Sequence, residues 1–233
     1  MKTEVVLIIF LLVAGVVTVV LYKLQTAKES YLYNNNQYPA LYINLDHRLD
    51  RRNQIEYEFD KMDINTYNRI DAIKNIKGYI GCSQSHIACL TYAKKMGYPR
   101  MIIFEDDFQF LIDSQEFHRL LDHLLSVNYD VMMLSYNSPS NDITDIGDPL
   151  LRRIRDTQTS SGYIVSQHYY DTLLNNLKEG LEKLLETDNV SVYAIDIYWK
   201  QLQKKDKWLC YYKRMGKQRE SYSDIENKNT KYG

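Results

Sequence analysis

The sequence is poor in the residues that define several protein classes. It has 3 cysteines among 233 residues, and this small, odd number excludes a disulfide framework as the basis of the fold. A single bridge remains open between Cys82 and Cys89, or between one of them and Cys210. No Gly-x-Gly-x-x-Gly loop follows the first predicted strand, so we set aside a nucleotide-dependent enzyme of the Rossmann type.

The chain also lacks an excess of charge of either sign. It has 29 Lys and Arg residues against 30 Asp and Glu residues, a formal net charge of -1, which gives no reason to expect nucleic acid as a partner. No internal repeat is visible. A content of 45% hydrophobic and 25% charged residues is typical of a globular protein with one good core.

One long uncharged segment stands apart from this composition. Residues 5–22 carry no charge and approach the length of about 20 residues that crosses a hydrocarbon core. The segment is longer than the apolar region of a signal peptide and has no clean cleavage site, which favours an uncleaved anchor. We therefore expect an anchor with its flank at 1–23, a flexible stem at 24–38 and a folded domain at 39–233.

The rest of the chain alternates between predicted strands and helices. This order favours one α/β domain with a mostly parallel sheet flanked by helices. Asp46 is expected to cap the first helix, whose apolar face carries Ile55, Phe59 and Met62. The predicted strands cover 40–45, 66–70, 100–105, 130–135, 159–166 and 208–212. Predicted helices begin at Asp46, Gly78 and Asp113 and cover 168–178, 180–186 and 194–199. Gly97 and Pro99 are expected to end the helix that begins at Gly78. We expect 136–149 as a loop and 218–226 as a polar tail.

The most informative stretch is an apolar run that passes directly into three acids. The predicted strand 100–105 leads without a break into Glu105, Asp106 and Asp107. Ligands of open α/β sheets bind at the carboxyl ends of strands. Adjacent carboxylates repel one another, so a divalent ion such as Mg²⁺ or Mn²⁺ would compensate their charge. The alternative is a solvated acidic turn that closes the strand.

A second cluster has the opposite charge. Arg48, Arg51 and Arg52 gather at the start of the helix that follows the first strand. Guanidinium groups and the amides at a helix N-terminus both favour phosphate. The alternative is a surface helix on which these arginines pair with Asp46 and Asp50.

A third group has the residue types of a zinc site. Cys82, His86 and Cys89 are spaced i, i+4 and i+7, which places them on one face of a helix. A structural zinc usually needs a fourth ligand, and none is apparent. Small buried cysteines on a core-facing stripe with Leu90 and Ala93 are therefore the better interpretation.

Taken together and in order, these stretches resemble glycosyltransferase family 25, which includes bacterial lipooligosaccharide galactosyltransferases and procollagen galactosyltransferases. The resemblance covers about residues 40–226. It is carried by Asn44-Leu-Asp with Arg51-Arg52, Ile80-Gly-Cys-Ser-Gln-Ser-His86, Ile103-Phe-Glu-Asp-Asp107, Ser161-Gly-Tyr-Ile-Val-Ser166, Ile195-Asp196, and Gln218 followed by Ser223-Asp-Ile225. It implies a GT-A-type glycosyltransferase fold, a nucleotide-sugar donor and a divalent metal ion.

The resemblance also implies roles for particular residues. Asp107 is expected as the direct metal ligand, with Asp106 and Glu105 supporting it. Asp224 or Gln218 is expected to complete the metal or diphosphate site from the tail. Asp196 is expected as the catalytic base of an inverting transfer, although aspartate is also common in the first turn of a helix. The expected donor-nucleotide contacts are Asn44, Arg48, Arg52, Ser85, His86 and Asp106.

These roles imply a membrane-anchored, metal-dependent enzyme that moves galactose or glucose from a UDP-sugar to a glycan or a hydroxylated acceptor. The alternative is a non-catalytic descendant that binds glycan or nucleotide beside an active transferase. Lys2, Lys23 and Lys28 flank the apolar segment on both sides, so charge does not fix its orientation. By analogy with similar enzymes, we expect a single-pass, type II membrane protein.

Overall fold

The computed structural model describes residues 38–137, 142–223 and 228–230. The predicted anchor lies outside these residues, as does nearly all of the predicted stem. Within the described residues, no helix has both the length and the apolar character needed to cross a membrane. The division of the chain into anchor, stem and domain stays a prediction.

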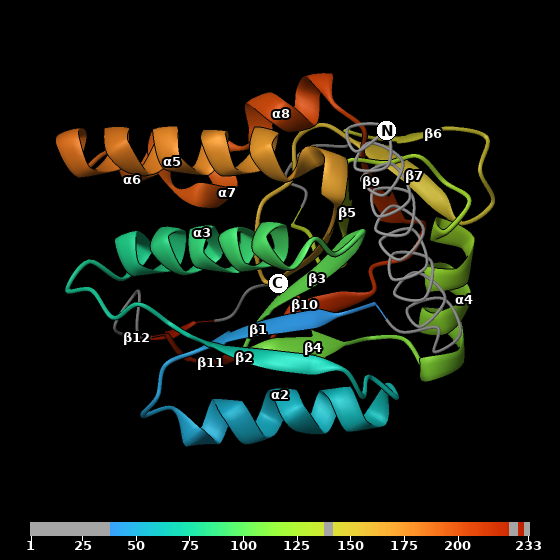
Figure 1. The fold of residues 1–233 in the computed structure, drawn as a ribbon, viewed down its shortest axis with the longest axis horizontal. Helices are drawn as coiled ribbons and strands as arrows, with labels where there is room; N and C mark the ends of the chain where they lie inside the picture. Colours follow the sequence, from blue (N-terminus) through green and yellow to red (C-terminus); the bar gives the residue numbers. More distant parts are fainter. Residues whose placement is uncertain (1–37, 138–141, 224–227, 231–233) are drawn as a thin grey trace, which may run out of the picture. The chain divides into compact units, whose positions relative to one another are not determined.

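The described residues form a mixed eight-stranded sheet with the order β2-β1-β3-β8-β5-β9-β7-β6. Strands β8 and β7 run opposite to all the others. The prediction of an α/β fold with a mostly parallel sheet is therefore confirmed (Figure 1). The strands are β1 Ala40–Asn44, β2 Tyr67–Asp71, β3 Arg100–Glu105, β5 Val131–Met133, β6 Ile143–Asp145, β7 Leu151–Ile154, β8 Gly162–Ser166 and β9 Trp208–Tyr211.

Side chains of the central strands alternate between two helical layers. In β1, Ala40 and Tyr42 belong to the core on one face, and Leu41 and Ile43 to the core on the other, as the period of two in a strand requires. Figure 1 shows α2 on one side of the sheet and α3 and α5 on the other. The helices are α2 Leu49–Lys61, α3 Gly78–Met96, α4 Ser114–Leu124, α5 Tyr170–Thr187, α6 Val190–Tyr193, α7 Ile195–Tyr198 and α8 Lys200–Lys205, with a 3-10 turn at Gln167–Tyr169.

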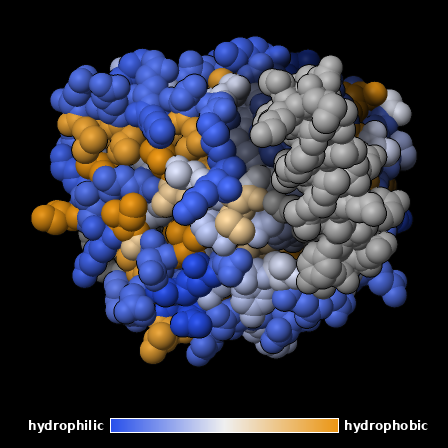
Figure 2. All heavy atoms as spheres, viewed as in Figure 1, coloured by the Kyte–Doolittle hydropathy of each residue, from blue (hydrophilic) through white to orange (hydrophobic). Residues whose placement is uncertain are grey.

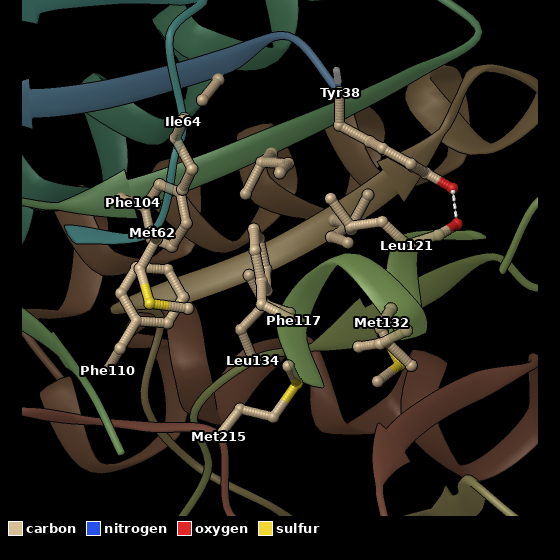
Figure 3. Close-up of a cluster of buried hydrophobic side chains, with 14 of the residues drawn as sticks. Tyr38, Met62, Ile64, Phe104, Phe110, Phe117, Leu121, Met132, Leu134 and Met215 are labelled. Carbon is tan, nitrogen blue, oxygen red and sulfur yellow. Dashed lines mark hydrogen bonds between the residues drawn. The ribbon is translucent and has the colours of Figure 1, made fainter. Parts of the chain in front are cut away.

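The first of these cores is rich in aromatic rings (Figure 3). The ring centroids of Phe104 and Phe110 lie 5.7 Å apart, and those of Phe110 and Phe117 lie 5.1 Å apart; both pairs are edge to face. The Tyr38 hydroxyl donates to the Leu121 carbonyl oxygen at 2.8 Å. The buried hydroxyl is thus satisfied, and the first described residue is fastened to α4.

A short strand directly after the acids pairs with a strand near the C-terminal end of the chain, and two further short strands pair beyond it. Strand β4 (Phe108–Phe110) pairs antiparallel with β10 (Gly216–Gln218), and β11 (Ser221–Ser223) pairs with β12 (Lys228–Thr230). The predicted polar tail therefore contains strands. This pairing brings Gln218 beside Phe108, one residue beyond the acidic triplet.

Two predicted helix boundaries are wrong. Asp46 does not cap α2, because its carboxylate pairs with Arg69 at 3.3 Å; the helix begins at Leu49 after Arg48, without a side-chain capping bond in the described structure. The predicted helices 168–178 and 180–186 form the single helix α5. Gly180 does not interrupt it: a Cβ there would lie 2.7 Å from the Tyr198 ring, so the glycine allows close packing.

Other helix ends agree with the sequence. Gly97 ends α3 in the left-handed conformation, as glycine does after many helices. The Asp113 carboxylate accepts the Glu116 amide at 2.7 Å and so caps α4. In contrast, β6 lies inside the predicted loop 136–149 and β7 was not predicted; both are short strands at one edge of the sheet.

The visible surface is mostly hydrophilic, with apolar side chains gathered on the side of α3 and α5 to α7 (Figure 2). Among the exposed apolar residues on α5 and α6, Leu185 is 58% exposed and Val192 is 43% exposed. Exposed apolar residues of this kind are ordinary on a folded surface. They identify no binding site by themselves.

Gly162 is predicted to be intolerant of any side chain. A Cβ at this position would lie 2.4 Å from the Phe108 ring. We expect Gly162→Ala to lower the free energy of unfolding by about 1–3 kcal/mol, the usual cost of overpacking, as measured by urea denaturation. When Phe108→Leu is present in the same chain, Gly162→Ala should cost less, because the ring that the added Cβ meets is gone. If the losses of stability from the two substitutions simply add, this explanation is contradicted.

Candidate active site

The carboxyl ends of β1, β2 and β3 border a cavity of about 340 Å³. This volume falls within the range of about 300–1,000 Å³ that is common for small-molecule sites. Because the three strands are parallel, the loops that follow them meet at one edge of the sheet. The lining includes Arg51, the loop 72–76, the first turns of α3, the acids 105–107 and Gln218.

Asn44 holds one member of the acidic triplet. Ile43 is in register with Glu105, which places Asn44 beside Asp106. Its amide donates to Asp106 Oδ2 at 2.7 Å and to the Arg48 carbonyl at 3.1 Å, and its oxygen accepts Arg69 Nε at 3.1 Å. These bonds orient Asp106. The predicted contact of Asn44 with a nucleotide stays a prediction.

Arg51 is the arginine of the first helix that reaches the acids. Its Nη1 lies 3.0 Å from Asp106 Oδ1 and 3.5 Å from Asp107 Oδ2. Arg48 pairs instead with Asp50, and Arg52 with Glu56. Among the residues described, the cavity lining includes Arg51 but neither Arg48 nor Arg52. Their predicted donor contacts stay predictions.

The packing of α2 decides which arginine faces inward. Arg48 precedes the first helical residue, Leu49, and Arg51 and Arg52 point about 100° apart around the helix. All three arginines are visible in the sequence. The sequence does not show which side of the helix faces the acids, so it does not single out Arg51.

Asp107 is the least satisfied of the three acids. It is 5% exposed, and its Oδ1 is buried without a hydrogen-bond partner in the described structure. Burial raises the pKa of Asp107 to about 8, the charges of Glu105 and Asp106 add to this effect, and Arg51 opposes it. A partnerless oxygen within an excess of negative charge fits a hard divalent cation such as Mg²⁺ or Mn²⁺.

Asp106 and Glu105 are better satisfied. Burial raises the pKa of Asp106, whereas Arg51 and Asn44 lower it. Glu105 Oε1 accepts the Ser160 hydroxyl at 2.5 Å and lies 3.2 Å from His86 Nε2. Burial disfavours the charge on Glu105, yet the hydrogen bonds with His86 and Ser160 hold the pKa of Glu105 below its usual value.

Ser85 and His86, two predicted site residues, both line the cavity. The Ser85 hydroxyl donates to the Gly81 carbonyl at 2.6 Å and accepts the Ile73 amide at 2.8 Å, which fastens the β2–α3 loop to α3. His86 is fully buried and its Nδ1 lies 2.8 Å from the Tyr163 hydroxyl. Both side chains therefore shape the cavity wall.

Asp196, the predicted base, is connected to the site by a hydrogen bond with Thr159. Its Oδ2 accepts the Thr159 amide at 3.0 Å. Burial raises the pKa of Asp196. The hydrogen bond from the Thr159 amide lowers this pKa, and the charge of Glu105 raises it. In the described part of the chain Asp196 is not a lining residue of the cavity. It lies at the rim of the charged cluster rather than on the cavity surface.

Thr159 is a site residue that the sequence did not reveal. Its φ of 82° is rare for a β-branched residue, and such strain tends to occur at functional sites. Its hydroxyl donates to Gln218 Oε1 at 3.0 Å, so Thr159 links Asp196 to the tail. Gln218 lines the cavity, whereas Asp224, the other predicted tail ligand, lies outside the described residues.

The cysteines of α3 pack against the core, as the preferred interpretation of their spacing expected. All three, which lie in the described part of the chain, are free thiols. Cys89 is packed in the second hydrophobic core with Leu90 and Ala93, as expected. Cys82 is half-buried and packs at the margin of the same core, and its sulfur, a His86 ring nitrogen and a Glu105 oxygen lie within 4.8 Å of one another.

Comparison with known proteins gives similar folds only. No protein-family model and no curated protein matches the chain. Similar solved structures include A197 from STIV (12% identity, TM-score 0.41, 75% of this chain and 81% of that one). Two other similar structures are glycosyltransferases. One is involved in glycosylation of the major capsid of PBCV-1 (8% identity, TM-score 0.42, 76% of this chain and 92% of that one). The other is GlyE of Streptococcus pneumoniae TIGR4 (9% identity, TM-score 0.39, 75% of this chain and 38% of that one). At these scores the similarity carries no argument for the function of this chain.

Arg51→Ala tests whether the arginine is the counter-ion of the acids. Removing one partner of a buried ion pair costs about 3–5 kcal/mol, and we expect a loss of this size in urea denaturation without metal. Mn²⁺ should restore more stability to this variant than to the unsubstituted protein, because it supplies the missing positive charge. Arg52→Ala is the matched control, since the Arg52–Glu56 pair is more exposed (43% and 27%) than the Arg51–Asp106 pair (11% and 10%); equal effects at the two positions would contradict the assignment.

Proposed function

We propose that this chain is a metal-dependent glycosyltransferase that moves a hexose, galactose or glucose, from a UDP-sugar to a glycan or a hydroxylated acceptor. The observation that carries the proposal is the partnerless Asp107 oxygen within three acids that line a cavity at the carboxyl ends of parallel strands. The motif resemblance to glycosyltransferase family 25 supports the same assignment.

Asp107 would hold a Mn²⁺ or Mg²⁺ ion, with Asp106 and Glu105 adding negative charge beside it. When bound, such an ion neutralises charge that develops on the diphosphate of the leaving nucleotide. The chain itself adds positive charge around the same cavity. Arg51 and Lys74 line it, as do the first turns of α3, where the helix dipole favours an anion.

Asp196 is proposed as the base that takes the proton of the acceptor hydroxyl. A base works best when its pKa lies near the operating pH, and burial raises the pKa of Asp196. The Thr159 amide holds one carboxylate oxygen of Asp196 and so fixes its orientation. We infer that the acceptor approaches along Thr159 and Gln218, because Asp196 reaches the cluster on that side.

The uncharged segment 5–22 is proposed as the anchor of a single-pass, type II membrane protein. Its length is close to the span of a hydrocarbon core. In this arrangement the stem 24–38 would separate the transferase domain from the membrane surface. The acceptor would then be a glycan or protein presented near that surface.

Asp107→Asn tests the metal site. The substitution keeps the shape of the side chain but removes the negative charge, so we expect metal-dependent binding of UDP to be lost while the protein remains folded. The measurement is calorimetric titration of the full-length protein with UDP, with and without Mn²⁺. Asp46→Asn is the control, because the Asp46 side chain is 96% exposed on a neighbouring loop.

Each result of this titration has a definite meaning. Unchanged, metal-dependent binding in Asp107→Asn would remove Asp107 as the ligand. No UDP binding by the unsubstituted protein in either condition would remove the UDP-sugar from the proposal. Metal-dependent UDP binding without transfer to any acceptor would favour a non-catalytic binding protein.

Asp196→Asn tests the base. Since a positioned base contributes about 10²–10⁴-fold to such a transfer, we expect kcat to fall by that factor while the affinity for UDP is unchanged. Transfer is measured by release of UDP from the sugar donor in the presence of acceptor. Near-normal turnover would exclude this role, and loss of UDP affinity would indicate a role in donor binding instead.

A further inference from the structure

A second group of metal-ligating side chains, of different chemistry from the three acids, lies on the wall of the same cavity. Cys82 and His86 lie one turn apart on α3, and Glu105 lies at the end of β3. One ligand atom from each, a sulfur, a ring nitrogen and a carboxylate oxygen, lies within 4.8 Å of the other two. We propose that Cys82, His86 and Glu105 bind zinc.

The surroundings of two ligands already hold them in place. The His86 Nδ1 lies 2.8 Å from the Tyr163 hydroxyl; if it donates its proton there, Nε2 keeps a free lone pair on the side of Glu105. Ser160 donates to Glu105 Oε1 at 2.5 Å. Hydrogen bonds of this kind to the far side of a ligand orient it and raise metal affinity.

The donor atoms favour zinc over Mg²⁺ or Mn²⁺. Thiolate and imidazole are soft or borderline ligands that suit zinc, whereas carboxylate-only sets suit the harder ions. Zinc bonds of about 2.0–2.3 Å require these ligand atoms, which lie within 4.8 Å of one another, to move closer by up to about 1 Å on binding.

Zinc binding exchanges bonds in a balanced way. The Cys82 thiol gives its proton to water in the cavity and gains a bond from sulfur to zinc. The Nε2 proton that His86 shares with Glu105 moves to Nδ1 or to water, and each of these two residues then gains a bond to the metal. All three residues line the cavity. A fourth position would therefore be open to water or a bound molecule, as in zinc sites with three protein ligands. This inference does not depend on the proposed transfer reaction.

Cobalt reports on this site without any assay of activity. The full-length protein, purified in detergent and reduced, is titrated with Co²⁺ alone. We expect a thiolate-to-cobalt charge-transfer band in the near ultraviolet that saturates at one equivalent and disappears when Zn²⁺ is added. Metal analysis after dialysis should then find one zinc per chain.

Variants assign the band to Cys82. Cys82→Ala and Cys82→Ser should both lose it, whereas Cys89→Ala, a matched control on the same helix whose sulfur is buried in the hydrophobic core, should keep it. Asp107→Asn should also keep the band although it loses metal-dependent UDP binding, so failure of the transferase proposal and failure of this one are distinguishable.

Two results would overturn the zinc site. One is the absence of a thiolate band from the unsubstituted protein, which decides the matter even if the Cys82 variants fail to fold. The other is a band that persists in folded Cys82→Ser, because the sulfur ligand would then be a different cysteine.

Discussion

The burial of Asp106 and Asp107 beside the partly buried Glu105, at the end of β3, is the constraint on which the surrounding structure depends. Asp106 and Asp107 are 7% and 5% exposed, and adjacent buried anions are costly unless each is compensated. The compensation comes from separate elements: Asn44 from β1, Arg51 from α2, His86 from α3 and Ser160 from the approach to β8. The cavity is therefore formed where these elements converge on one charge cluster.

The reversed strand β8 explains how the later half of the chain joins this cluster. Because β8 is antiparallel to β3, with Phe104 opposite Gly162, the residues that precede β8 lie beside Glu105. The chain enters this position through Thr159 in a left-handed conformation, at a cost of about 1–3 kcal/mol. Hydrogen bonds from Thr159 to Asp196 and Gln218 hold the strained residue. The conformation of Thr159 places Ser160 where its hydroxyl donates to Glu105.

Local features of the sequence were sufficient to predict much of the fold. The apolar run before Glu105 indicated a buried strand, Gly97 marked the end of α3, and Asp113 marked the start of α4; the structure confirms all three. The errors arise where tertiary contacts decide. Gly180 is accommodated within α5 because Tyr198 packs against it.

The site was harder to predict than the fold, for the same reason. The acidic triplet and His86 were recognisable as a group of chemical types. The contact of Arg51, rather than Arg48 or Arg52, with the acids depends on how α2 packs, and the proximity of Glu105 to Cys82 depends on how α3 packs on β3. Neither relation is encoded in the spacing of residues along one element. Residues such as Thr159, whose importance lies in backbone conformation, leave no signal in residue type at all.

The three acids differ in how far the protein itself satisfies them, and this difference separates their roles. Glu105 has two hydrogen-bond partners and a lowered pKa, whereas Asp107 keeps a partnerless oxygen and a raised pKa. A hard cation beside Asp107 would relieve the repulsion among the three carboxylates, and it would displace no hydrogen bond from Asp107 Oδ1. A soft cation at Glu105 must first replace the bond to His86, and the Cys82 thiolate has to offset that loss. The two cation sites therefore draw on different sources of free energy although their ligands include residues only two positions apart in sequence.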